Sequence, residues 1–240
     1  MTLLACCCDA RGCSEPVPTS RSVASVEVPP VLWIPYRTGE IRIDGELTEV
    51  DWSRALRTAP FRDQWTKREA VPYSEARLLW DHEYLYLGLD AEDEDIEARA
   101  TVPGSTEKAD DAFDISFHVG HPHSGYTTMH VNALGTVTEQ RARGQKARGA
   151  PWSSGAQVAA QALGTINDRS DRDRWWTVEA RIPLAQVGLL EPRPFDDGYR
   201  TDTLSLSIKR CDFGIRGEDR CGVWSSYALR LERPDGQQQR

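Results

Sequence analysis

Residues 75–95 read Glu-Ala-Arg-Leu-Leu-Trp-Asp-His-Glu-Tyr-Leu-Tyr-Leu-Gly-Leu-Asp-Ala-Glu-Asp-Glu-Asp, and this stretch decides the fold. Every second residue is apolar on both sides of Asp81-His82-Glu83. A period of two places alternate side chains on one sheet face, so the pattern predicts two strands joined by a tight polar turn. Leu79, Tyr84 and Tyr86 fall on the second face and are also apolar, so we expect that face to be at least partly covered.

The next clear pattern runs from Asp111 to Val119, where apolar and polar residues alternate. It predicts a strand with one face in the core and the other facing solvent or a groove. A second alternating run after a turn at 121–125 predicts the hairpin partner, with Met129 in the core. If these strands pair, their polar side chains share one candidate ligand-binding surface: Asp114, Ser116, His118, Thr128 and His130.

Residues 26–56 predict an extended approach and one helix. Three prolines restrict 26–36 to an edge strand, and 41–43 is expected to form a short strand. Residues 47–56 carry apolar side chains at helical spacing after Thr48, which is a suitable N-cap. Trp52 on this helix is expected to fill the core.

Shorter patterns complete an all-β chain. Alternation predicts strands over 157–165, 175–180, 204–209 and 224–231, and 184–190 fits a short helix. Residues 93–111 are expected to form a polar, solvated loop. With about nine to eleven strands, the chain predicts a two-sheet antiparallel β-sandwich with one or two short helices.

Composition bounds the domain organisation and the partners. The 240 residues fit one sandwich over 36–233, after a leader and linker over 1–35 and before a polar tail over 234–240. With 37 acidic and 29 basic residues the net charge is −8, which argues against non-specific nucleic-acid binding. No later segment approaches the ~20 apolar residues of a membrane span. The oligomeric state is not indicated.

Several stretches together resemble carbohydrate-binding module family 9 and its relatives, a group of DOMON-like β-sandwiches of jelly-roll type. The matching pieces are Ile43-Asp44-Gly45-Glu46-Leu47 with Trp52, Leu78-Leu79-Trp80-Asp81 with Tyr84-Leu85-Tyr86, Asp110-Asp111, Val131-Asn132-Ala133-Leu134-Gly135, and Trp176 to Pro183. They occur in the family's order between about residues 40 and 231. The resemblance implies this fold and a polysaccharide or oligosaccharide ligand.

The resemblance also implies a sugar site, with one departure. Asp114 matches an acidic position of the family strand, and His130 stands where a basic partner is expected. The family's two stacking tryptophans should lie just before Asp111 and after Trp224-Ser225, and both positions lack tryptophan here. Trp152, expected to be exposed at the end of a long loop, or Trp65, in a charged loop, could replace them.

Six cysteines divide between the N-terminus and one later pair. Cys211 and Cys221 flank a polar Gly-containing loop between two strand-like runs, which predicts a disulfide at the base of a hairpin. Structural zinc is the poorer alternative, because no second ligand pair lies nearby.

The four cysteines in the first 13 residues include Cys6, which follows Leu3-Leu4-Ala5 as in the lipidation site of a bacterial lipoprotein signal. A charged segment and most of the apolar segment of such a signal do not precede it. The alternative is a tail whose thiols have no specific role. The lipoprotein interpretation predicts an exported chain, either anchored by lipid in the cell envelope or extracellular, and a longer apolar run upstream.

Motifs for chemistry are sparse. The sequence has no nucleophile elbow, metalloprotease motif, phosphate loop or dinucleotide fingerprint. Asp93, Asp95 and Asp111 are weak calcium candidates and are otherwise expected to be solvated. Haem on a methionine would follow some relatives of the fold, and His118, His121 and His123 invite a metal interpretation, but Met129 lies in phase with core residues.

The sequence therefore predicts a non-catalytic, weakly binding carbohydrate module, with ligand contacts from Asp114, His130, Ser116, His118 and Trp152. The alternatives are an accessory or protein-interaction sandwich without a sugar site and, less favoured, a haem-binding domain.

Overall fold

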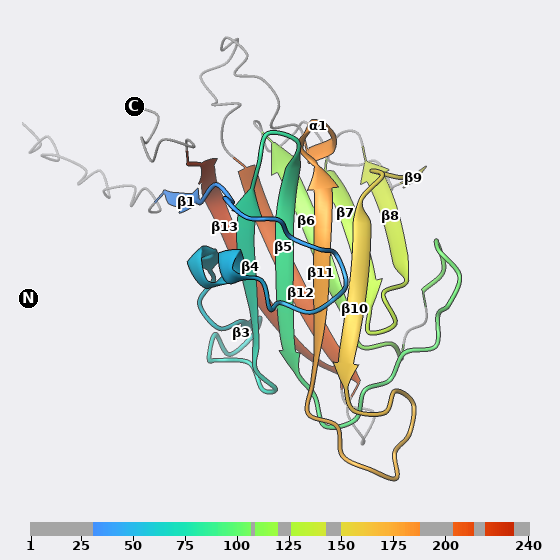
Figure 1. Ribbon diagram of the computed structural model, residues 1–240. Helices are drawn as coiled ribbons and strands as arrows, with labels where there is room; N and C mark the ends of the chain where they lie inside the picture. The colour runs from blue at the N-terminus through green and yellow to red at the C-terminus, as the bar shows by residue number, and fades with distance from the viewer. Residues whose placement is uncertain are drawn as a thin grey trace, which may run out of the picture.

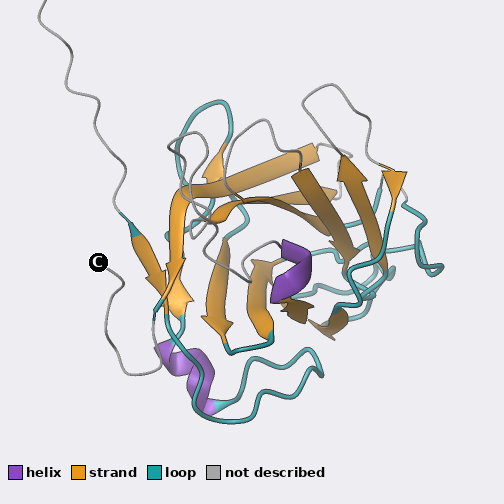
Figure 2. Ribbon diagram, turned by 90° about the horizontal axis from the view of Figure 1, so that it is seen from above, coloured by secondary structure: helices purple, strands orange, loops and turns teal. Residues whose placement is uncertain are grey.

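The computed structural model describes residues 31–106, 109–119, 126–142, 150–187, 204–213 and 219–232. These residues form two sheets that pack face to face, with very little helix (Figures 1 and 2). The predicted all-β sandwich is confirmed. The strands are β1 (Leu32–Ile34), β2 (Leu56–Arg57), β3 (Arg62–Asp63), β4 (Ser74–Trp80), β5 (Tyr84–Glu92), β6 (Ala112–Val119), β7 (Tyr126–Asn132), β8 (Val137–Ala142), β9 (Ala150–Pro151), β10 (Gln157–Leu163), β11 (Trp175–Pro183), β12 (Leu204–Phe213) and β13 (Asp219–Leu231).

The two sheets differ in size and composition. The eight-stranded sheet has the order β1-β13-β12-β6-β7-β8-β9, with β3 also paired to β13. The five-stranded sheet has the order β10-β11-β5-β4-β2. All pairs are antiparallel except β1 with β13, so the proline-flanked edge strand is confirmed at a sheet edge. The short strands β2, β3 and β9 have two residues each, too few for an alternating pattern to reveal them.

The opening hairpin is confirmed as β4 and β5, which pair from Ser74 with Ala91 to Trp80 with Leu85. One face of this hairpin supplies the core between the sheets, together with the inward residues of β6, β7, β11 and β12. Met129 is fully buried in that core, as predicted. Burial of so many large apolar side chains at about 25 cal/mol per Å² is the main stabilising contribution to a sandwich of this kind.

The second face of the hairpin is covered by the segment that precedes β2. Residues 36–54 cross the outer surface of the five-stranded sheet (Figure 1), and Trp52 packs there against Leu79 and Tyr86. Glu179 of β11 fastens this segment, because its carboxylate accepts hydrogen bonds from the Asp44 and Gly45 backbone N–H groups and from Trp52 Nε1 at 2.9–3.1 Å. The outer face of the eight-stranded sheet is the one that remains for a ligand.

Three local predictions in the first part of the chain were wrong. Residues 41–43 form no strand, because they run across a sheet face and the following turn bonds to a side chain. The helix over 47–56 is a 3₁₀-helix over Val50–Arg54, and its N-cap is Glu49 rather than Thr48, with no side-chain capping bond. Trp52 on it is buried, as predicted.

The second predicted helix is α1 (Leu184–Val187), at one end of the sandwich (Figure 2), while residue 190 lies outside the described residues. The Cys211–Cys221 disulfide joins directly opposite residues of β12 and β13, with Cα atoms 4.2 Å apart, so that prediction is confirmed. Neither helix of the described residues is long and apolar enough to cross a membrane.

Candidate functional site

The hairpin of β6 and β7 places the predicted polar side chains on the open face of the eight-stranded sheet. Asp114 lies opposite His130, and Ser116 lies opposite Thr128. His130 Nδ1 lies 2.7 Å from Asp114 Oδ1, and because an ionised carboxylate only accepts, the imidazole donates this hydrogen bond. The Nε2 atom of His130 is buried and has no hydrogen-bond partner within the described part of the chain.

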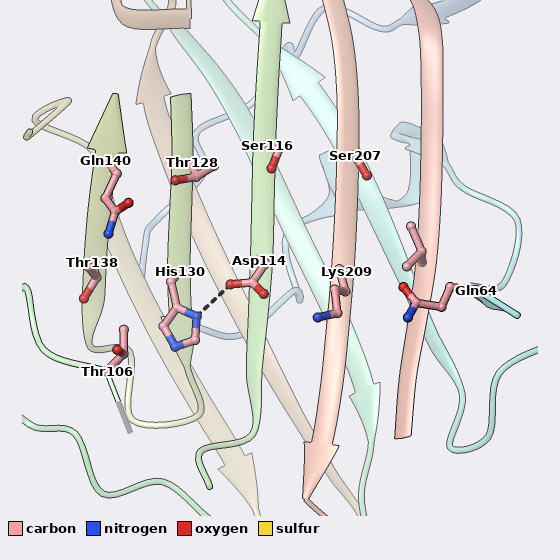
Figure 3. Close-up of a pocket in the computed structure, with 11 residues that line it drawn as sticks. Gln64, Thr106, Asp114, Ser116, Thr128, His130, Thr138, Gln140, Ser207 and Lys209 are labelled. Atoms are coloured by element: carbon pink, nitrogen blue, oxygen red, sulfur yellow. Dashed lines mark hydrogen bonds and ion pairs between the residues drawn. The ribbon is translucent and has the colours of Figure 1, made fainter. Parts of the chain in front are cut away.

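A pocket of about 550 Å³ lies over this pair and crosses several strands (Figure 3). Val223 is the one apolar residue among those that the structure describes in its lining, and none of them is a tryptophan, tyrosine or phenylalanine. These residues are Gln64, Thr106, Asp114, Ser116, Thr128, His130, Thr138, Gln140, Ser207, Lys209 and Val223. Thr138 Oγ1 donates a 2.8 Å hydrogen bond to the Ser105 carbonyl and so holds the loop that supplies Thr106.

The prediction of a shared surface is confirmed for Asp114, Ser116, Thr128 and His130, all of which line the pocket. His118 lies on the same strand face but outside this lining, where its ring is 5.7 Å from that of Tyr126. The nearest lining residue on β6 is Ser116, two positions before His118.

Lys209 and Ser207 were missed as site residues. Their strand shows a clear alternation, but no local pattern reveals that β12 pairs with β6. The pairing sets Lys209 opposite Asp114 and Ser207 opposite Ser116. A prediction that β12 pairs with β6 would have found both residues, because directly opposite residues of paired strands point to the same face of the sheet.

Trp152 was predicted to contact the ligand, and the structure places it elsewhere. Its ring lies under the Arg141 guanidinium, 3.8 Å from the ring centroid. Arg141 lies opposite Thr127 of β7. Thr127 points to the other sheet face from Thr128, which shares the face of Asp114. Arg141 and the Trp152 ring that packs on it therefore lie on the side away from Asp114. Trp65, by contrast, is 82% exposed and directly follows Gln64 of the pocket lining.

Most of the described acidic residues of 93–111 are buried, although they were expected to be solvated; Glu94 is the exposed exception. Asp93 and Asp111 are buried together with Asp212, and carboxylate oxygens of all three lie within 4.8 Å of one another. Arg210, also buried, donates to Asp93 at 2.7 Å and pairs with Asp212 at 3.4 Å. Asp95 is buried near this group, and its ion-pair partner is Arg169 at 3.4 Å. The burial of these acids was not predicted, because their cationic partners lie far away in the sequence.

The donor set of this cluster was tested against the calcium hypothesis. Calcium takes six to eight oxygen ligands. Both Asp111 oxygens already accept 2.7 Å hydrogen bonds from backbone N–H groups, and one Asp93 oxygen is held by Arg210. Burial raises the pKa of Asp111 to about 8, and the neighbouring Asp93 charge adds to this shift. With a guanidinium among its carboxylates, the cluster fits an internal ion-pair network rather than a calcium site.

Some predicted residues lie outside the described residues. They are Cys6, His121 and His123, together with positions 107 and 108 just before Asp111, where the family resemblance implies one of the stacking tryptophans. Predictions that depend on them remain predictions.

Comparisons with known proteins agree with this geometry. The profile of the family described as carbohydrate family 9 binding domain-like matches residues 43–207. A candidate carbohydrate-binding protein from Bacteroides uniformis ATCC 8492 superposes with a TM-score of 0.57 at 15% identity, covering 84% of this chain and 91% of that one. A family 9 carbohydrate-binding module from Caldicellulosiruptor kristjanssonii, solved with glucose, gives a TM-score of 0.50 at 16% identity, covering 85% and 98%.

No curated protein sequence matches the chain. The solved structures share the fold, and the family profile spans more than half of the residues, including both strands of the Asp114–His130 pair. This chain belongs to the carbohydrate family 9 binding domain-like family.

Proposed function

We propose that this domain binds carbohydrate without transforming it, and that the pocket over Asp114 and His130 is its ligand site. The observation that carries the proposal is the 2.7 Å Asp114–His130 pair on a rigid sheet face, in a 550 Å³ pocket lined by hydroxyl and amide groups. Such groups exchange hydrogen bonds with sugar hydroxyls. The similar module from Caldicellulosiruptor kristjanssonii is a glucose complex, which supports this ligand class.

Weak binding is part of the proposal. Sugar rings gain affinity by stacking on aromatic faces, at about 0.5–1.5 kcal/mol for each ring beyond area burial. None of the described residues in the pocket lining is a tryptophan, tyrosine or phenylalanine. We expect dissociation constants from about 100 μM to the millimolar range.

The test is a titration of the protein with neutral and acidic oligosaccharides by calorimetry and NMR. The double variant Asp114→Ala, His130→Ala should lose all binding, because it removes the paired acceptor and donor from the pocket floor. A matched control is Glu94→Ala, Arg172→Ala, which removes an exposed ion pair remote from the pocket and should leave binding unchanged. If no glycan at about 10 mM, well above the expected constants, shifts residues of this face, the accessory-domain alternative replaces the proposal.

We also propose that the protein is exported and anchored by lipid on Cys6. The Cys211–Cys221 disulfide supports export, because disulfides persist mainly in oxidising compartments. Expressed behind a complete export signal, the wild-type chain should fractionate with membranes and Cys6→Ser with the soluble fraction. Equal distribution of the two would contradict the anchor.

A further inference from the structure

The pocket lining contains one lysine that is not part of an ion pair. Among the described residues of this lining, Asp114 is the only carboxylic acid and Lys209 is the only lysine or arginine. No carboxylate of the described residues lies within 4.0 Å of the Lys209 ammonium, so the lysine has no ion pair there. Figure 3 shows Lys209 on β12, on the opposite side of Asp114 from His130.

Asp114, in contrast, already has a partner. His130 holds one of its oxygens at 2.7 Å, and the Asp114 side chain remains 48% exposed. Its free oxygen can accept hydrogen bonds from sugar hydroxyls. Lys209 is directly opposite Asp114 in the β6–β12 register, and such cross-strand Cβ atoms lie about 5 Å apart. The floor thus places a cationic donor beside an anionic acceptor.

We propose that the pocket selects a sugar that carries an acidic group, with the acid bound by Lys209 and ring hydroxyls bound by Asp114. This inference rests on the proposed carbohydrate-binding function. The acidic group is a carboxylate, as in a uronic acid, or a sulfate ester, since both present several oxygens to an ammonium.

The composition of the lining supports this choice over a neutral sugar. Since the described lining residues include no tryptophan, tyrosine or phenylalanine, we expect hydrogen bonds to supply most of the affinity. Hydrogen bonds in which a partner is ionised are roughly twice as strong as neutral ones. A neutral sugar leaves the Lys209 charge without such a bond, whereas an acidic sugar supplies one.

The experiment compares matched ligands by NMR titration of the whole chain. Methyl glucoside is paired with methyl glucuronide, and methyl galactoside with methyl galacturonide, so that each pair differs only at C6. Glucose 6-sulfate separates sulfate from carboxylate recognition. We expect an acidic ligand to bind about tenfold more tightly than its neutral counterpart at low salt. In 0.5 M NaCl the difference should shrink, because added salt screens a half-exposed charge.

Two variants assign the preference to Lys209. Lys209→Gln should reduce the ratio of acidic to neutral affinity to near one, while Lys209→Arg should keep most of it. Arg174→Gln, which removes the same charge from an exposed residue directly before β11, should keep the full ratio.

Other outcomes separate the two proposals. Equal binding of neutral and acidic sugars, or a ratio that survives Lys209→Gln, overturns the selection of acidic sugars and leaves carbohydrate binding standing. Failure of every ligand to shift the pocket residues refutes carbohydrate binding and this inference with it.

Discussion

Trp65 is the only aromatic residue among the exposed large apolar side chains of the described chain. Its turn is fixed by Asp63, whose Oδ1 accepts hydrogen bonds from the N–H groups of Trp65 and Thr66 at 3.0 and 2.6 Å. These bonds also lower the pKa of the Asp63 carboxyl, the bond from Thr66 most. An indole held in this way beside Gln64 is suited to stack on a sugar unit that extends from the pocket.

We therefore expect Trp65→Ala to weaken binding of a trisaccharide about three- to tenfold and to change monosaccharide binding little. The unfolding free energy should stay within about 0.5 kcal/mol of wild type, because the side chain buries little surface. Calorimetry measures the first effect and urea denaturation the second. Leu163→Ala, another exposed apolar residue, is the control and should alter neither. A proportional loss for both ligands would place Trp65 outside any outer subsite.

Glu179 is a single buried carboxyl that makes stability depend on pH. Burial raises its pKa to about 7 from an ordinary 4.5, although its hydrogen bonds to Asp44, Trp52 and Gly45 oppose this shift. A folded-state pKa above the unfolded value means that the protonated form is favoured by folding. The resulting stability is complete below about pH 4.5 and is lost as the pH rises through about 7.

The expected result is an unfolding free energy that falls between pH 5 and pH 8. Glu179→Gln should show a shallower fall, because the amide does not titrate, and a loss of about 1–3 kcal/mol at pH 5, because its NH₂ faces N–H donors. Asp111, with a pKa of about 8, adds a fall of the same sign, so some slope remains. Denaturant titrations at the two pH values measure both effects. An unchanged slope in Glu179→Gln would exclude Glu179 as the source.

At the scale of elements, the disulfide joins the two strands that border the pocket on one side. Cys211 is two residues from Lys209 on β12, and Cys221 is two residues from Val223 on β13. A short loop closed in this way stabilises by at most about 3 kcal/mol in the chain-entropy account. Reduction should therefore lower the melting temperature modestly without unfolding the domain.

Thiol titration tests the bond directly. The unfolded, unreduced domain from Ser25 onward contains only Cys211 and Cys221, and it should show no free thiol. Two free thiols would contradict the bond. The melting temperature with and without reductant gives its contribution.

The alternating pattern predicted the strands of the two main hairpins. It failed for the segment that crosses the outer face of a sheet. The β4–β5 and β6–β7 hairpins follow from period-two patterns in residues close in sequence. The segment around Ile41 also carries apolar residues, but these residues pack on a sheet face that other strands form. Its conformation depends on the Glu179 carboxylate, 134 positions beyond Gly45, so no local pattern reveals it.

At the scale of the molecule, the same dependence on residues far away in the sequence explains why only part of the pocket lining was predicted. Asp114 and His130 were predicted because one hairpin carries both. Lys209 joins them only through the pairing of β12 with β6, two strands that are far apart in the sequence. The position of Trp152 was not predicted because it packs on Arg141, whose sheet face depends on the β7–β8 register. The pattern of one hairpin thus identified Asp114 and His130, and the order of the strands in the sheet determined which other residues line the same pocket.

Arg210 connects the two sheets through the core. It lies on β12 of the eight-stranded sheet, and its partner Asp93 directly follows β5 of the five-stranded sheet. Removing one member of a buried charge cluster leaves the others uncompensated, which costs about 3–5 kcal/mol. Arg210→Met should destabilise the domain by that amount.

The control is Arg172→Met, whose guanidinium is 73% exposed and pairs with an exposed Glu94. It should change the unfolding free energy by less than about 1 kcal/mol. Equal effects of the two substitutions would show that the Arg210 network contributes nothing specific. Chemical denaturation of the folded variants provides the comparison.

The pocket draws its lining from five adjacent strands, β8, β7, β6, β12 and β13. Four strand spacings of 4.7–4.9 Å make this row about 19 Å wide, perpendicular to the strands. A single sugar covers only part of such a row, with Thr138 and Gln140 near one end and Gln64 at the other. A polysaccharide that fills this row is bound along its length rather than at its terminus. The number of protein molecules that one polysaccharide chain can bind should therefore increase with the length of the chain.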